Sequence, residues 1–207
     1  MIGNGNSPRR RRAASAVGAA LLIALALTGC ANDDLAKQYA SGDGKNYIAG
    51  SGVVEVKAAD RDKPVDFSGK TEDGTTFSSA AHRGHVMVVN FWYADCPPCR
   101  AEAKDLQKAN TTFAGDGVVF VGVNTRNDED QTRSFDRTFG VTYPSILDVN
   151  GGAVQLAFSG SMRPNATPTT FVLDERGRIA AQISGGIDVQ PSTLDTLIRS
   201  ALAEGDS

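Results

Sequence analysis

The sequence has very few cysteines. Its 207 residues include only three, Cys30, Cys96 and Cys99. A small domain held together by disulfides would need more cysteines and wider loops between them, so a structural disulfide framework is excluded. No internal repeat is visible, and the chain is long enough for one domain with a hydrophobic core of its own.

Histidine and positive charge are also scarce. The chain has only two histidines, and its 21 basic residues face 24 acidic ones. Four arginines at positions 9–12 lie before Cys30, in a segment without acidic residues, so the rest has 21 minus 4, or 17, basic residues and a net charge of −7. This acidic balance argues against nucleic acid as a partner and against a polybasic membrane-binding patch.

The N-terminal segment has the features of an export signal. The arginines at 9–12 are followed by an apolar stretch at 13–27 that is too short for a comfortable membrane span. It ends in Leu27-Thr28-Gly29-Cys30, which resembles a bacterial lipobox. We therefore expect a lipoprotein signal peptide at 1–29, lipidation of Cys30, and a flexible Gly/Ser-rich tether over 30–52. A buried apolar helix that happens to precede a cysteine is the alternative.

Residues 53–207 alternate between strand-forming and helix-forming segments and should form one domain. Asp73-Gly74 between β-forming residues predicts a hairpin turn. Strands are expected over 86–93, 118–123, 169–174 and 179–183, a short extended piece over 144–148, and helices over 96–113, 127–139 and 191–204. Asn127 and Asp130 occupy capping-box-like positions at the start of the second helix. The order predicts an α/β fold, a mixed sheet with helices on both faces.

The motif Cys96-Pro97-Pro98-Cys99 lies at the junction of the first strand and the first helix. A helix N-terminus has free N–H groups and a positive dipole end, which favour a thiolate at Cys96. A thiolate beside a second thiol is the minimal apparatus for making or breaking a disulfide. Because proline has no N–H, the amides of Cys99 and Arg100 are the main donors left near Cys96. We therefore predict a moderately lowered pKa for the Cys96 thiol and a reducing disulfide.

Three motifs together give a resemblance to a known family. They are Val89-Asn90-Phe91-Trp92, Cys96-Pro97-Pro98-Cys99-Arg100-Ala101-Glu102 and Thr167-Pro168-Thr169-Thr170-Phe171. From about residue 64 to 203 the chain resembles the thioredoxin superfamily, and more closely the TlpA/ResA-like membrane-anchored thiol–disulfide oxidoreductases. The resemblance implies a thioredoxin fold, a central mixed sheet flanked by helices on both faces, with an N-terminal β-hairpin extension.

The resemblance also implies roles for individual residues. Cys96 would attack a partner's disulfide, and Cys99, the more buried of the two, would resolve the mixed disulfide. Thr167-Pro168 would form a cis-proline turn whose backbone receives the substrate. Trp92 and Pro97 would complete the substrate-binding surface beside the disulfide.

Glu102 is the candidate proton acceptor for Cys99 by the same resemblance. It follows Cys99 by three residues and so projects from about the same helix face. A solvated helix glutamate is the alternative. Asn90 stands where ordinary thioredoxin has a buried aspartate, and because asparagine cannot titrate, protons would have to pass through Glu102, Asp95 or water.

Some features of the sequence could also belong to other classes of protein. His82 and His85 with the two cysteines could supply four zinc ligands on paper. The seven-residue strand between the pairs, at about 3.3 Å per residue, separates them by roughly 20 Å, so no metal site is expected. Copper delivery would want a downstream histidine, and none follows His85. A peroxiredoxin-like peroxidase would carry a Pro-x-x-x-Thr-x-x-Cys setting, which is absent, and a non-catalytic binding lipoprotein is the alternative from another class.

The sequence thus predicts a protein lipid-anchored on the outer face of the bacterial cytoplasmic membrane. Its partners would be disulfide-containing exported proteins, with apocytochrome c suggested by the family, and a membrane thiol electron donor. It would need no cofactor beyond the redox-active Cys96–Cys99 disulfide.

Overall fold

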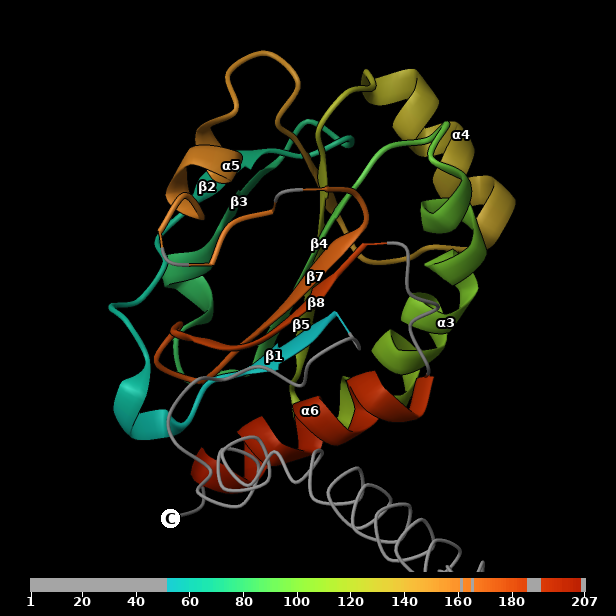
Figure 1. Ribbon diagram of the computed structural model, residues 1–207. Helices are drawn as coiled ribbons and strands as arrows, with labels where there is room; N and C mark the ends of the chain where they lie inside the picture. Colours follow the sequence, from blue (N-terminus) through green and yellow to red (C-terminus); the bar gives the residue numbers. More distant parts are fainter. Residues whose placement is uncertain (1–51, 161, 165, 186–190, 206–207) are drawn as a thin grey trace, which may run out of the picture. The chain divides into compact units, whose positions relative to one another are not determined.

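The structure is a computed structural model that describes residues 52–160, 162–164, 166–185 and 191–205 (Figure 1). The predicted signal peptide, the lipidation site Cys30 and nearly all of the predicted tether lie outside these residues. No helix within the described ranges is both long and apolar enough to cross a bilayer. The boundaries at 29 and 52 stay predictions.

A six-stranded mixed sheet lies at the centre of the domain, in the order β1-β8-β7-β4-β5-β6. The strands are β1 (Val53–Glu55), β4 (Met87–Trp92), β5 (Val119–Asn124), β6 (Ser145–Leu147), β7 (Thr169–Leu173) and β8 (Ile179–Ser184). β4, β5 and β6 run parallel, while β7, β8 and β1 continue the sheet in antiparallel pairs. Every residue of β4 is buried, as the apolar sequence of a strand covered on both faces predicts, and Asn90 is its single polar residue. The edge strand β1 was not among the predicted strands.

Helices cover both faces of this sheet, as predicted (Figure 1). α3 (Pro97–Phe113) and α6 (Pro191–Gly205) pack on one face through Leu106, Phe113, Leu194 and Ile198. α4 (Glu129–Phe139) lies beside α3. The other face carries α5 (Ala153–Ala157) and the separate hairpin of β2 (Ser68–Lys70) and β3 (Thr76–Ser78). Single 3₁₀ turns η1 (Ala58–Asp60), η2 (Ser79–His82) and η3 (Ala114–Asp116) complete the elements.

The alternation of side chains along β4 decides what reaches the site. Met87, Val89 and Phe91 pack against the hairpin and α5, whereas Val88 and Trp92 point to the side of α3. Successive residues of a strand face opposite sides, so Asn90, between Val88 and Trp92 in this alternation, also points toward α3. One polar side chain is thereby placed in the layer between the central strand and the helix that carries the cysteines.

The start of α4 differs from the prediction. Its N-cap is Asp128, whose Oδ1 accepts a hydrogen bond of 2.9 Å from the amide of Gln131. Asn127 does not cap the helix, because its Oδ1 accepts a 2.6 Å hydrogen bond from the amide of Ala94. This bond ties the loop after β5 to the segment that leads into the cysteine motif, so the side chain serves a tertiary contact in place of a local one.

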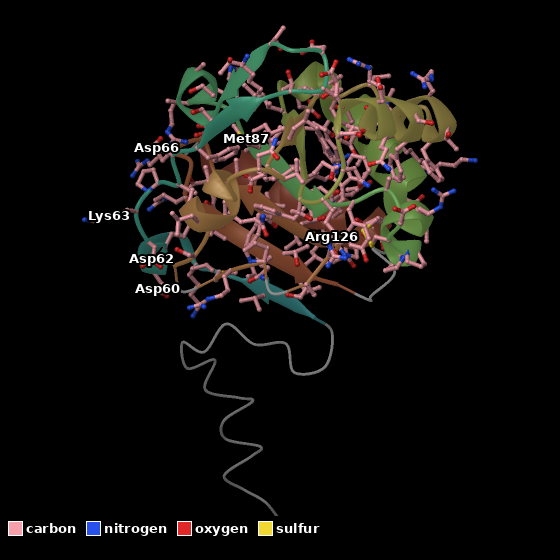
Figure 2. All side chains as sticks on the ribbon, turned by 90° about the horizontal axis from the view of Figure 1, so that it is seen from above. Asp60, Asp62, Lys63, Asp66, Met87 and Arg126 are labelled. Carbon is pink, nitrogen blue, oxygen red and sulfur yellow. A yellow bond between two sulfur atoms is a disulfide. The ribbon has the colours of Figure 1, made fainter. Side chains whose placement is uncertain are left out.

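Charged side chains line the segment between β1 and β2, and Figure 2 shows Asp60, Asp62, Lys63 and Asp66 at the outside of the domain. Met87 of β4, by contrast, is labelled in the interior. Arg61 lies among them but turns inward, and only 2% of its side chain is exposed. Its guanidinium forms ion pairs with Asp174 at 3.0 Å and with Glu204 at 2.5 Å. The segment is thereby fastened to the β7–β8 turn and to the end of α6.

Candidate active site

The two cysteines of the motif form a disulfide at the N-terminus of α3, with Sγ atoms 2.04 Å apart. Cys96 is the N-cap, and its Sγ accepts a 3.2 Å hydrogen bond from the amide of Cys99. The prolines occupy the first turn, so they contribute no donor. The amide of Arg100 donates to the carbonyl oxygen of Cys96 at 3.1 Å, not to the sulfur. The Cys96 sulfur therefore has one of the two predicted amide donors.

Both cysteines are almost fully buried, since Cys96 is 1% and Cys99 2% exposed. The two cysteines are buried to nearly the same degree in this disulfide state, so the expected greater burial of Cys99 stays a prediction. The carbonyl oxygen of Thr167 lies 3.7 Å from Cys96 Sγ, so the Thr167–Pro168 segment sits directly against the sulfur. The peptide bond between Thr167 and Pro168 is cis, as the motif predicts.

Trp92 packs beside the disulfide, in one apolar cluster with Cys96, Cys99, Ala103 and Phe135. The ring centroids of Trp92 and Phe135 are 4.1 Å apart, so the indole joins the end of β4 to α4. Trp92 itself is 4% exposed. The structure thus gives it a packing role next to the sulfurs, and its part in substrate binding stays a prediction, as does that of the exposed Pro97.

Glu102 is buried in the domain and paired with Asn90. Asn90 Nδ2 donates to Glu102 Oε1 at 2.9 Å and to Thr170 Oγ1 at 2.9 Å, which joins α3, β4 and β7. The side chain is only 5% exposed, so the alternative of a solvated glutamate is wrong. Burial raises the pKa of Glu102 from 4.5 to about 8, against the opposing hydrogen bond from Asn90 and with a smaller contribution from the charge of Asp105. Near pH 7 this carboxyl holds a proton in most molecules.

The exposed rim of the site carries two arginines stacked on aromatic rings. The guanidinium of Arg100 lies 5.0 Å from the Phe139 ring centroid, and that of Arg126 lies 4.2 Å from the Tyr93 ring centroid. Asp95, the other acid weighed for proton transfer, is exposed.

His82, one of the two histidines that could supply zinc ligands on paper, lies against the β2–β3 hairpin. The His82 ring stacks on Phe77 with centroids 4.9 Å apart, on the hairpin. Within the described part of the chain, no three His, Cys, Asp or Glu side chains are placed to hold a metal ion.

A small polar cavity behind Cys99 was missed by the prediction. It measures about 10 Å³ and is lined by Asn90, Trp92, Cys99, Ala103, Leu106, Phe135, Asp136, Val141, Tyr143 and Ser145. Asp136 could have been noticed, because it follows the buried Thr132 by four residues and so shares a face of α4 with it. Nothing in the local sequence marks Tyr143, which lies just before β6, or Ser145, the first residue of β6.

Comparison with known proteins agrees with this site. Residues 57–198 match the Redoxin family, and the chain belongs to it. The thiol–disulfide oxidoreductase ResA of Halalkalibacterium halodurans is 26% identical over 129 residues, which are 62% of this chain and 70% of that protein. A thioredoxin-family thiol:disulfide interchange protein from Chlorobium tepidum TLS has a similar structure, with TM-score 0.62 and 31% identity over 69% of this chain and 97% of that one. A secreted thiol-disulfide isomerase from Corynebacterium glutamicum aligns with TM-score 0.65 and 26% identity over 78% of this chain and 96% of that one.

The thioredoxin fold is therefore confirmed, and so is the predicted resemblance to ResA. The protein is a thiol–disulfide oxidoreductase, and its cysteine pair is already joined at disulfide distance. Disulfide exchange requires one sulfur that can attack or leave, a second sulfur within bonding reach, and a group that exchanges protons. The first turns of α3 supply all three.

Proposed function

We propose that the protein is a lipid-anchored reductant of disulfides in exported proteins, acting outside the cytoplasmic membrane, with apocytochrome c as its substrate class. The observation that carries the reducing direction is the poor stabilisation of a thiolate at Cys96. One amide donates to its sulfur, and the prolines remove the others of the first turn. A disulfide is a strong oxidant when its reduced form is stabilised, so a site that stabilises its thiolate little favours the disulfide and gives up electrons.

The reaction proceeds through a mixed disulfide. The Cys96 thiolate attacks one sulfur of the substrate disulfide, a new S–S bond forms, and the first substrate sulfur leaves with the electron pair and takes up a proton. Cys99 then loses its proton to the ionised form of Glu102, which is the minority form at pH 7, and attacks the Cys96 sulfur to form the Cys96–Cys99 disulfide. The second substrate sulfur leaves and is protonated by solvent. Two electrons pass from the dithiol to the substrate, and no cofactor takes part.

The cis-proline segment supplies the substrate contact in this proposal. The carbonyl of Thr167 sits against Cys96 Sγ, at the place where an extended substrate segment would meet the sulfur. Backbone pairing of this kind recognises an unfolded chain without reading its side chains. The dithiol must afterwards be restored, and we assign that to a membrane thiol electron donor on the same side of the membrane.

The substrate class is tested with two peptides of the same composition. One contains an oxidised Cys-x-x-Cys-His sequence, the pattern of c-type haem attachment, and in the other the two cysteines close a longer loop. The reduced full chain should reduce the first peptide about tenfold faster, a preference of roughly 1.4 kcal/mol. Stopped-flow thiol detection gives both rates, with insulin as a general disulfide substrate. Equal rates for the two peptides would argue against apocytochrome c and for a general reductant of exported proteins.

The anchor is tested by Cys30→Ala in cells that export the protein. The native chain should be recovered with membranes, because two acyl chains give a stable anchor where one does not. The variant should leave the membrane fraction, and mass spectrometry should find a diacylglyceryl-modified Cys30 only in the native protein. The redox activity of the released variant serves as the control and should be unchanged. A variant that stays on the membrane would show that something other than lipid at Cys30 holds the protein there.

A further inference from the structure

The cavity behind Cys99 contains polar atoms that the packing leaves without partners. In the described residues, two buried side-chain oxygens have no hydrogen-bond partner, Asp136 Oδ1 and Ser145 Oγ. Both residues line this one cavity, together with Cys99 and with Asn90, the partner of Glu102. Buried polar atoms are nearly always paired, and a pair of unpaired oxygens around one space marks a site for a small polar guest. A volume of about 10 Å³ is the lower limit for a single water molecule.

The space for this cavity comes from a glycine on β5. Gly122 pairs with Asn90 of β4 and with Ser145 of β6 in the sheet. A Cβ at this position would collide with Ser145 Oγ and lie 2.7 Å from the indole nitrogen of Trp92. A side chain at position 122 would therefore push into the space between Trp92 and Ser145, which both line the cavity, and the glycine keeps this space open.

Asp136 lies at the other side of the cavity, toward the surface. It also lines a larger groove of about 390 Å³, together with Glu72, Asp73, Arg133, Arg137 and Tyr143. Tyr143 lines both spaces, and burial together with the charges of Glu102 and Asp136 raises the pKa of its hydroxyl. Tyr143 is thus within electrostatic reach of both carboxyls. Asp136 and Tyr143 therefore connect the cavity behind Cys99 with the groove.

From this arrangement we propose that Asp136 is a second proton-holding residue of the redox site, joined to Cys99 and Glu102 through the cavity and to solvent through the groove. When Cys99 attacks the mixed disulfide, its S–H bond breaks. The proton passes to Glu102 in molecules where that carboxyl is ionised, and into the cavity where it is already protonated. Asp136 takes up the proton from the cavity side, through the water site and Tyr143, and releases it into the groove. The electron pair of the attacking sulfur remains in the new Cys96–Cys99 bond, so only a proton travels this route. Asp136 does not touch the sulfurs. It acts on Cys99 only by holding and releasing this proton, and is therefore a positioning residue.

The charges around Asp136 suit it to this role. Burial, and then the negative charge of Glu72, raise the pKa of Asp136 from 3.8 to about 7, while Arg137 lowers it. Glu72 is held in place because its Oε2 accepts from the amide of Ser145 at 2.7 Å and its carbonyl oxygen accepts from Arg133 at 2.5 Å. On the cavity side the facing titratable groups are Glu102 and Tyr143. A carboxyl in this setting exchanges protons around neutral pH, whereas an ordinary aspartate would be ionised throughout.

The test is the pH profile of Cys99 attack in the Asp136→Asn variant of the full chain. Reduced protein is mixed with 5,5′-dithiobis(2-nitrobenzoate), which reacts with Cys96 and releases one coloured thiolate, and the second release then reports the attack by Cys99. The second phase should slow about threefold to tenfold, less than the roughly hundredfold loss typical when a group that itself transfers the proton is removed. It should also lose its inflection near pH 7, while the first phase keeps its rate. In Asp136→Ala, added formate should restore the second phase.

Asp130→Asn is the matched control, since Asp130 lies on the same helix with 92% of its side chain exposed. Its profile should coincide with that of the native chain. The proposal does not depend on the identity of the protein substrate, so it can fail while the substrate assignment stands. It is overturned if the Asp136→Asn profile superimposes on the native one, if both phases slow equally, which would indicate a disturbed fold, or if formate fails to restore the alanine variant.

Discussion

Cys96→Ser is expected to abolish disulfide reduction, by at least roughly three orders of magnitude, whereas Cys99→Ser should still attack and then stop. A serine hydroxyl at position 96 is not ionised near neutral pH, so no mixed disulfide forms. With serine at position 99, the Cys96 thiolate remains at the start of α3, but nothing can displace the substrate from it. The first variant should therefore be inactive in every assay, and the second should accumulate a covalent complex.

The measurement is single-turnover mixing with insulin or with a peptide disulfide, followed by non-reducing mass spectrometry. Cys99→Ser should add the mass of one substrate chain, and reductant should remove it. The double variant should add none. Since both cysteines are nearly inaccessible in the disulfide form, their exposure does not assign the roles, and trapping decides them. A complex that forms on Cys96→Ser, and not on Cys99→Ser, would reverse the assignment of nucleophile and resolving cysteine.

Glu102→Gln is expected to be more stable than the native protein at alkaline pH. Folding raises the pKa of Glu102 from 4.5 to about 8, so the native state holds a proton that the unfolded chain releases between these values. Stability is therefore highest below pH 4.5 and is lost as pH rises toward 8, by up to about 5 kcal/mol from this one group. Glutamine keeps the oxygen that accepts from Asn90 Nδ2 but carries no titratable proton.

Urea unfolding of the oxidised proteins at several pH values measures this effect. From pH 4.5 to 9 the free energy of unfolding should fall much less in Glu102→Gln than in the native chain. The decrease that this variant still shows below pH 7 is attributed to Asp136, whose pKa folding also raises. Glu55→Gln, at an exposed position on β1, is the control and should follow the native curve. Identical curves for Glu102→Gln and the native protein would mean that Glu102 titrates as an ordinary solvated carboxyl.

Most of the fold was predictable from local patterns. The apolar run before the cysteines, the Asp73-Gly74 turn and the amphipathic stripe of the last helix each specify their element by short-range physics. The predicted N-cap of α4 was wrong because a side chain such as Asn127 has two competing uses, a local cap or a tertiary bond, and the sequence alone does not rank them. The edge strand β1 was missed because three residues carry too little pattern, and its pairing with β8 is long-range.

The residues of the site also divide into those that the sequence predicts and those that only the structure reveals. Cys96, Cys99 and the cis Thr167–Pro168 bond were visible because their spacing and neighbours form a motif. The burial of Glu102 was not visible, since a glutamate on a helix is usually solvated. Its environment follows from the fact that Asn90 points to the α3 side of β4, and this depends on how strand and helix pack.

The sequence by itself determined the chemistry of this protein: two thiols at a helix start, prolines that withhold amides, and a single pair of cysteines in the domain. Only the tertiary structure decided how the protons are held. Four segments, β4, α3, α4 and the entry to β6, converge behind Cys99 and enclose Glu102, Asp136 and a small polar cavity. Desolvation depends on every neighbour that excludes water, and those neighbours come from distant parts of the chain, so no local pattern records it.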